Sequence, residues 1–268
     1  MKRLLTACIS VTLALAACGC ASSEKSDESS ADSTSAASTE STEQTASETE
    51  ETPVEDNSYT LLADFSKGAS DKFIPSDGWS NGSPFDCTWK KDNCTFEDGL
   101  MKLTISTYIP EEYNAAEYRT NDFYGYGLYE VSMKPINNIG VVSSFFTYTG
   151  PTDGNPWDEV DIEFLGKDTT KVQFNYYTDG KGGHEYLCDL GFDASEDFHT
   201  YGFDWEADKI TWYVDGKEVY SATENLPSTP GKLMMNAWNG KGVDGWLGHF
   251  DGTTPLTAEY QWARFTAK

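Results

Sequence analysis

The segment "WDEVDIEFLG", residues 157–166, decides how this chain folds. Within it, carboxylates alternate with apolar side chains: Glu159, Val160, Asp161, Ile162, Glu163 and Phe164. Because side chains alternate across a β-strand, a strand here sends the three acids to one face and the three apolar residues to the other. Acids placed this close raise one another's pKa values, so the segment predicts a strand with a crowded acidic face.

The sequence on either side predicts an all-β fold. Across residues 59–268, short alternating or β-rich runs are separated by Gly, Asn, Asp and Pro, and no helical periodicity lasts more than two turns. Asp215-Gly216, inside "VDGKEV", predicts a two-residue β-hairpin. These 210 residues are enough for one large core. We therefore expect one domain, a mostly antiparallel β-sandwich with the apolar face of residues 159–164 between its sheets.

Residues 1–20 are typical of a bacterial secretory signal. Lys2 and Arg3 precede an apolar run that is too short to cross a bilayer, and the run ends in "LAAC" at residues 15–18. Small residues before a cysteine resemble the lipobox of bacterial lipoproteins, in which the cysteine is acylated. Cys18 is therefore the candidate lipid anchor, and the expected location is secreted or at the cell surface. An ordinary secretory signal with an incidental cysteine is the alternative.

Residues 21–58 are rich in Ser, Thr, Ala, Glu and Asp and have little to bury, which predicts a disordered, solvated spacer. This spacer holds 11 of the 44 acidic residues and one lysine. Residues 59–268 hold the other 33 acidic residues against 16 basic ones, a net charge of −17. A body this acidic repels nucleic acid and anionic membranes, whereas a neutral polysaccharide is a compatible partner.

The acidic face of residues 159–163 has three interpretations: a solvated surface, a row of carboxylates that holds calcium, or a catalytic site. No basic residue lies between residues 151 and 167, which argues against an ordinary surface. Glycoside hydrolysis needs one ionised and one protonated carboxyl group, and crowding supplies the raised pKa that the second one requires.

Aromatic rings and amides elsewhere in the chain suit a sugar-binding groove. Sugars stack their C–H faces on aromatic rings and hydrogen-bond to amides and carboxylates through their hydroxyls. Both kinds of residue gather in motifs such as "GWSNG", "NAWNG" and "DGWLG", and the candidates are Trp79, Phe85, Tyr148, Tyr177, Trp238, Trp246, Asn81, Asn175, Asn236 and Asn239. Each aromatic residue taken alone is better explained as part of the hydrophobic core, but the whole group beside the amides favours a sugar-binding cleft.

Several motifs together resemble the bacterial licheninases of glycoside hydrolase family 16. They are E-x-D-x-E within "WDEVDIEFLGKDTTKVQFNYYTDGKGGHE", "AEYRTNDFYGYGLYEVSMKP", "VVSSFFTYTGPTDG", "GFDASEDFHTYGFDW", "WYVDGK" and "PSTPGKLMMNAWNGKGVDGWLG". The resemblance spans residues 61–266. It implies a curved jelly-roll sandwich with the substrate groove on its concave face, and endo-hydrolysis of mixed-linkage β-1,3-1,4-glucan with retention of configuration.

The resemblance also implies roles for single residues. Glu159 matches the nucleophile, Glu163 the general acid/base, and Asp161 the carboxylate between them that tunes the pair. The positions that contact substrate are Trp79, Asn81, Phe85, Glu117, Arg119, Phe146, Tyr148, Trp157, Asn175, Tyr177, Glu185, Asn236, Trp238 and Trp246. Trp79 replaces a tyrosine common in the family, a change that preserves stacking. The laminarinase branch usually carries one extra residue in the signature, which bulges the strand.

Two departures from the family pattern concern cysteines and calcium. The family's usual partner of Cys87 is Ala115 here, so either Cys94 takes its place across a "CTWKKDNC" hairpin or both thiols are free. Gln261 stands where the family's structural calcium site has an aspartate, so we assign no metal ligands.

A carboxylate hydrolase needs no cofactor for catalysis, and the three scattered histidines do not have the spacing of a zinc site. We expect a monomer that acts on a β-glucan, with membrane contact only through Cys18. A transglycosylase or a laminarinase of the same family, and a non-catalytic carbohydrate-binding lipoprotein, are the alternatives.

Overall fold

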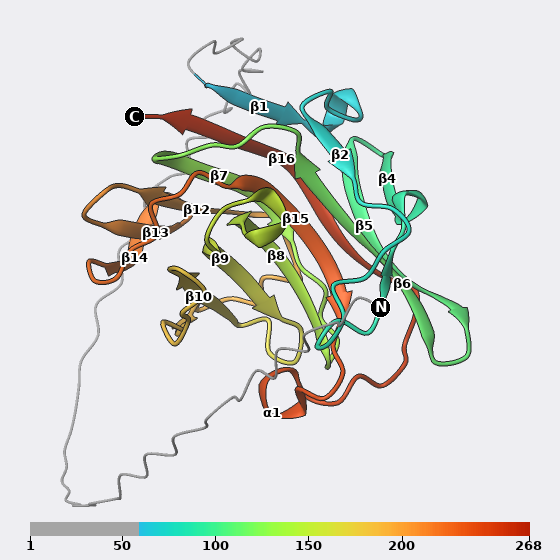
Figure 1. The fold of residues 1–268 in the computed structure, drawn as a ribbon. Coiled ribbons are helices and arrows are strands. Elements are labelled where there is room, and N and C mark those ends of the chain that lie inside the picture. Colours follow the sequence, from blue (N-terminus) through green and yellow to red (C-terminus); the bar gives the residue numbers. More distant parts are fainter. Residues whose placement is uncertain (1–58) are drawn as a thin grey trace, which may run out of the picture. The chain divides into compact units, whose positions relative to one another are not determined.

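Sixteen β-strands build the part of the chain that the structure describes, residues 59–268 of a computed structural model (Figure 1). The signal expected over residues 1–20, the lipid anchor at Cys18 and the spacer expected over residues 21–58 lie outside these described residues. No helix among residues 59–268 has both the length and the apolar character that a membrane crossing requires.

One layer, which we call the groove sheet, has the strand order β11-β10-β9-β8-β15-β6, and the short strands β2 and β3 pair with β6. The bounds of these strands are β2 Phe73–Pro75, β3 Thr88–Trp89, β6 Glu112–Thr120, β8 Val141–Thr149, β9 Asp158–Leu165, β10 Lys171–Tyr177, β11 Tyr186–Asp189 and β15 Lys232–Asn239. Every pairing in this layer is antiparallel except that of β3 with β6.

The other layer, which we call the back sheet, has the order β5-β16-β7-β12-β13-β14, with β1 on β16 and β4 on β5. Its strands are β1 Leu61–Asp64, β4 Cys94–Glu97, β5 Leu100–Ile109, β7 Gly127–Lys134, β12 His199–Trp205, β13 Ile210–Val214, β14 Lys217–Ala222 and β16 Leu256–Ala267. Because β5 also pairs with β6, the two layers join along one edge. The helices are short: η1 Phe65–Lys67, η2 Lys91–Asn93, η3 Pro151–Asp153 and α1 Asp244–Leu247.

The hydrophobic core lies between the two layers. The apolar residues of β9 are fully buried there, namely Val160, Ile162 and Phe164. Phe164 packs edge-on against Tyr201 of β12, with ring centroids 4.8 Å apart, and Phe174 of β10 stacks on Trp212 of β13 at 5.7 Å. Burying one such side chain contributes about 1.5–3 kcal/mol. The expected antiparallel sandwich is thus confirmed, and the acidic face of β9 points away from its core.

The turn at Asp215-Gly216 is the predicted hairpin. Val214 at the end of β13 pairs with Lys217 at the start of β14, so two residues make the connection. Asp215 has φ 48° and Gly216 has φ 72°, as a type I′ turn requires. The Asp215 carboxylate also accepts a hydrogen bond from the backbone N–H of Thr200 at 3.0 Å, which ties the hairpin to β12.

The disulfide considered between Cys87 and Cys94 is absent, because both thiols are free and buried. The segment between them forms the helix η2 instead of a hairpin turn. Cys87 leads into β3, which pairs with β6, whereas Cys94 begins β4, where it pairs with Leu103 of β5. The two cysteines thus lead into strands with different partners, which is the reason that the hairpin prediction was wrong.

The residue at the family's calcium position does not fit a metal site. Gln261 is exposed, and its Oε1 accepts a hydrogen bond from Ser132 Oγ at 2.7 Å. A neutral amide that already accepts a bond is a poor substitute for a carboxylate ligand. Among residues 59–268, no group of three or more His, Cys, Asp or Glu side chains has the arrangement of a metal site.

Candidate active site

The register of the groove sheet lines up polar side chains in rows, because residues paired across antiparallel strands point to the same face. The first row is Gln173, Glu163, Ser144, Asn236 and Glu117; the second is Asn175, Asp161, Phe146, Met234 and Arg119; the third is Tyr177, Glu159, Tyr148 and Lys232. Each acid of the predicted cluster thus belongs to a row that crosses at least four strands.

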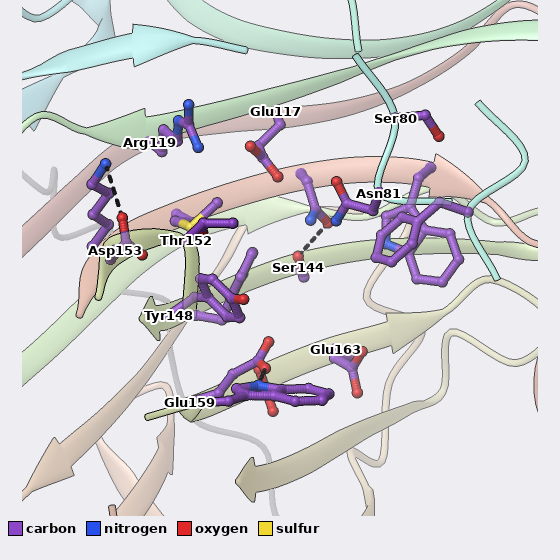
Figure 2. Close-up of a pocket in the computed structure, with 18 of the residues that line it drawn as sticks. Ser80, Asn81, Glu117, Arg119, Ser144, Tyr148, Thr152, Asp153, Glu159 and Glu163 are labelled. Atoms are coloured by element: carbon purple, nitrogen blue, oxygen red, sulfur yellow. Dashed lines mark hydrogen bonds and ion pairs between the residues drawn. The ribbon is translucent and has the colours of Figure 1, made fainter. Parts of the chain in front are cut away.

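The members of these rows on β9, β8, β15 and β6 line a groove of about 550 Å³. Figure 2 shows Glu159 and Glu163 projecting from one strand into the same space, with Glu117 and Arg119 on a strand across it. Thirteen of the residues expected at the site line this groove: Trp79, Asn81, Phe85, Glu117, Arg119, Phe146, Tyr148, Trp157, Glu159, Asp161, Glu163, Asn236 and Trp238. Residues as far apart in the sequence as Trp79 and Trp238 therefore line one groove.

Glu159 is held by the tryptophan that precedes it on the same face. Trp157 Nε1 donates a hydrogen bond to Glu159 Oε2 at 2.6 Å. The Trp157 ring in turn stacks on Tyr177 of β10, with centroids 4.6 Å apart and planes 12° apart. The Trp157 carbonyl accepts a bond from Gly180 N at 2.8 Å, so the ring, the backbone and the carboxylate are fixed together.

Glu163 is held from the neighbouring strand. Gln173 Nε2 donates to Glu163 Oε2 at 2.7 Å, and Gln173 Oε1 accepts a hydrogen bond from Trp246 Nε1 at 3.1 Å. Gln173 is buried, whereas Trp246, on α1, is half-buried. The second glutamate therefore has a partner that depends on a loop far away in the sequence.

Burial raises the pKa of all three acids, and like charge adds to the rise at Asp161 and Glu163. Burial raises the pKa of Glu159 to about 7, although hydrogen bonds with Trp157 and Asp161 act in the opposite direction. Asp161 lies between the two glutamates, and burial and both neighbouring charges raise its pKa well above its usual value. Burial, with added repulsion from Glu159 and Glu185, raises the pKa of Glu163 to about 8. Near neutral pH the cluster thus holds protonated and ionised carboxyl groups together.

The far wall of the groove has its own polar network. Ser76 Oγ donates to Glu117 Oε1 at 2.6 Å, and Ser144 Oγ donates to Asn236 Oδ1 at 2.6 Å. Burial raises the pKa of Glu117, while Ser76 and other neighbours lower it in part. The Arg119 guanidinium lies 5.3 Å from the centroid of the Trp79 ring. A charged and aromatic wall of this kind can take both the hydroxyls and the apolar face of a sugar.

Five expected residues do not line the groove: Asn175, Tyr177, Glu185, Trp246 and Asn239. Asn175 pairs with Asp161, and Tyr177 supports Trp157. Glu185 is exposed but close enough to raise the pKa of Asp161. Asn175, Tyr177 and Glu185 therefore border the acidic cluster on the side of β10 and β11. Trp246 contacts the cluster's neighbour Gln173, whereas Asn239 is buried and donates a hydrogen bond to the Asp86 carbonyl.

Sequence reasoning missed several residues at the site: Ser76, Ser80, Ser144, Thr152, Asp153, Gln173, Lys232 and Met234. Lys232 and Asp153 approach each other to 3.9 Å at one end of the groove. Five of these positions lie on strands or directly after one, where the alternation of the groove face marks the side to which they point. Their partners, however, follow only from the pairing of strands.

A groove with protonated and ionised acids in its floor and aromatic rings in its walls is typical of a glycoside hydrolase. Residues 81–264 match the model of glycosyl hydrolases family 16. The chain belongs to this family.

Individual relatives agree with that assignment. The chain is 61% identical to a "Beta-glucanase" of Paenibacillus macerans over 72% of this chain and 81% of that protein. It is 57% identical to a "Xylanase/beta-glucanase" of Ruminococcus flavefaciens over 80% of this chain, which spans only 28% of that longer protein. A solved "prokaryotic beta-1,3-1,4-glucanase (lichenase)" from a mouse hindgut metagenome is similar with a TM-score of 0.75 and 55% identity, covering 78% of this chain and 99% of that one.

Proposed function

We propose that this chain is an endo-β-1,3-1,4-glucanase that hydrolyses mixed-linkage glucan with retention of configuration. The observation that carries the proposal is the row of Glu159, Asp161 and Glu163 on the groove floor, with all three pKa values raised. The substrate follows from the relatives, since a similar structure is described as a beta-1,3-1,4-glucanase. The net charge of −17 on residues 59–268 also suits a neutral polymer.

In the first step, a carboxylate oxygen of Glu159 attacks the anomeric carbon of the bound sugar and forms a glycosyl ester. The bond to the leaving oxygen breaks, and the proton of Glu163 moves to that oxygen. Trp157 favours the ionised form of Glu159 by donating a hydrogen bond to it. Burial, with repulsion from Glu159 and Glu185, raises the pKa of Glu163 to about 8, so Glu163 holds a proton that it can donate near neutral pH.

In the second step, water attacks the anomeric carbon from the opposite side, its proton goes to Glu163, and the ester bond to Glu159 breaks. Two inversions restore the original configuration. Burial and the charges of Glu159 and Glu163 raise the pKa of Asp161 well above its usual value, which favours its protonated form. It thereby limits the negative charge that the cluster must carry while the ester forms and breaks.

Azide distinguishes the roles of the two glutamates. With an activated β-glycoside, Glu159→Ala leaves space on the nucleophile's face, so azide attacks once and the product is the α-glycosyl azide. Glu163→Ala still forms the ester, and azide then makes the second attack to give the β-glycosyl azide. NMR of the products identifies the anomers. The opposite pattern would exchange the two roles, and full activity of either variant would remove that residue from the mechanism.

Substrate choice is tested by reducing-sugar release. We expect barley β-glucan and lichenan to be cleaved, while laminarin and carboxymethylcellulose remain nearly untouched. Comparable rates on laminarin would contradict the mixed-linkage assignment and support the laminarinase alternative. Products longer than a defined oligosaccharide substrate would show that a sugar, rather than water, resolves the ester, as in a transglycosylase.

We propose further that the enzyme acts outside the cell, attached through an acylated Cys18. The support is the "LAAC" segment at residues 15–18 and the size of a polymeric substrate. Lipid labelling should be lost in Cys18→Ala, and the enzyme should move from the envelope to the medium. Unlabelled wild-type enzyme found free in the medium would contradict the anchor.

A further inference from the structure

The amide of Gln173 has a single orientation that satisfies both of its neighbours. On one side it meets Glu163 Oε2 at 2.7 Å, and on the other it meets Trp246 Nε1 at 3.1 Å. An indole N–H donates and cannot accept, so the amide oxygen must face Trp246. The amide NH2 is then left to face Glu163.

We propose that Trp246 is a positioning residue that fixes the orientation of the Gln173 amide and so keeps a hydrogen-bond donor against Glu163. The proposal rests on the role of Glu163 as general acid/base. A donor beside a carboxyl group favours its ionised form, whereas an acceptor favours its protonated form. If the amide turned over, its oxygen would face Glu163 and the proton of Glu163 would be held more tightly.

The surroundings of Glu163 make this one donor important. The other titratable groups that face it are all acidic: Glu159 and Asp161 on β9, Tyr177 on β10 and Glu185 just before β11. Within residues 59–268, Gln173 provides the side-chain hydrogen bond that offsets burial and this repulsion. Without it, burial and the charges of Glu159 and Glu185 would act unopposed to keep Glu163 protonated.

Trp246 is placed to act without belonging to the sheet itself. It lies on α1, in the loop between β15 and β16, and its ring is 6.1 Å from that of Trp238 in the groove wall. Gln173 lies next to Glu163 in the first row and is buried. The connection from loop to catalytic acid therefore runs through one buried amide, which has no other side-chain partner among the described residues.

The test is Trp246→Phe, which removes the indole N–H and keeps an aromatic ring. We expect the pKa of Glu163 to rise by about one unit, the effect of losing one charge-assisted hydrogen bond. The direct readout is a ¹³C NMR titration of protein labelled at glutamate side-chain carboxyls, with Glu163→Gln used to assign the resonance. The basic limb of the kcat/KM profile should move to higher pH by the same amount, because the protonated acid survives longer.

A double-mutant cycle with Gln173→Met tests whether Trp246 acts through Gln173. Gln173→Met removes both amide groups and should also raise the Glu163 pKa. Adding Trp246→Phe to it should produce no further shift. Additive shifts would mean that Trp246 acts on Glu163 by another route, and an unshifted resonance in Trp246→Phe would overturn the proposal.

Trp238→Phe is the matched control, because it also shortens a groove tryptophan but removes no bond to Gln173. The catalytic rate of Trp238→Phe is not part of the comparison, but its Glu163 carboxyl resonance should titrate as in the wild type. The NMR titration does not depend on activity. If the resonance shifts as expected but the basic limb stays in place, the proposed role of Glu163 fails while the control of its pKa by Trp246 stands.

Discussion

Asp158 and Asp161 lie three residues apart on β9 and each is 4% exposed, yet their pKa values shift in opposite directions. Asp158 accepts three backbone hydrogen bonds, from Asp179, Ser228 and Thr229, each at 2.9 Å. Burial raises its pKa, but these three donors outweigh burial and lower it.

Asp161 has instead a glutamate on each side, and its pKa is raised. The start of β9 is thus built for stability and its middle for chemistry. Burial alone decides neither outcome, because the direction of the shift follows from whether donors or acids surround the carboxyl group.

The largest effect should come from the middle of the strand. Glu163→Gln removes the transferable proton and should lower kcat on barley β-glucan by about 10²- to 10⁴-fold. The melting temperature at pH 7 should not fall, because a neutral amide replaces a carboxyl group whose ionised form is disfavoured there. Calorimetry and initial rates on the same samples check both points. A variant that loses stability along with activity would break the division of β9 into two parts.

The next largest effect should come from the start of the strand. Asp158→Ala removes the acceptor of three part-buried backbone hydrogen bonds, so the free energy of unfolding should fall by about 2–4 kcal/mol in urea titrations. The folded-state pKa of Asp158 is below its unfolded value near 3.8. Its contribution is therefore present above that value and lost as pH falls through the folded pKa. The difference between wild type and variant should shrink in acid; a difference independent of pH would contradict this account.

A smaller gain in stability is expected from Asp161→Asn. The folded-state pKa of Asp161 is raised, so its ionisation opposes folding progressively as pH rises above the unfolded value near 3.8. The variant should therefore be more stable than wild type by about 1 kcal/mol at pH 8, with no gain at pH 4. Its rate should fall, and its pH–rate profile should shift because the coupled pair is changed. A loss of stability at pH 8 would show that Asp161 is a structural residue like Asp158.

The smallest effect should come from a carboxylate whose pKa is lowered at the surface. Thr170 and Lys171 lower the pKa of Asp168, but its side chain is 39% exposed. Water screens the ion pair between Asp168 and Lys171, so Asp168→Asn should change the free energy of unfolding by less than about 0.5 kcal/mol. Urea titrations of Asp168→Asn and Asp158→Ala, run side by side, would show whether the loss of stability depends on the burial of the carboxylate. An equal loss of unfolding free energy in the two variants would mean that burial does not decide the effect.

The alternation in residues 159–164 was sufficient to predict the strand, its buried face and the acidic face that lines the groove. The hairpin turn at Asp215-Gly216 could also be predicted, because its geometry depends on two adjacent residues. Both features are local, so no knowledge of other strands was needed. Of the two alternatives for Cys87 and Cys94, the hairpin was wrong for the opposite reason, since partners elsewhere in the chain pair with both segments.

Residues that depend on distant partners escaped prediction. Gln173 is an ordinary strand residue until the register places it beside Glu163 and brings Trp246 to its other side. Ser144 and Asn236 likewise meet only because β8 and β15 pair. Asp158 stands beside the acidic signature, but nothing near it in the sequence distinguishes it from a catalytic carboxylate.

The position of β15 in the groove sheet has a consequence for how the chain folds during its synthesis. β6 and β8 are separated by only 20 residues in the sequence, yet β15, which begins at Lys232, lies between them. A chain that leaves the ribosome from its N-terminus therefore presents two unpaired strand edges until β15 has emerged, and such edges invite wrong pairing. The first row cannot form before this late strand inserts, so the onset of activity during refolding should report the completion of the sheet rather than its beginning.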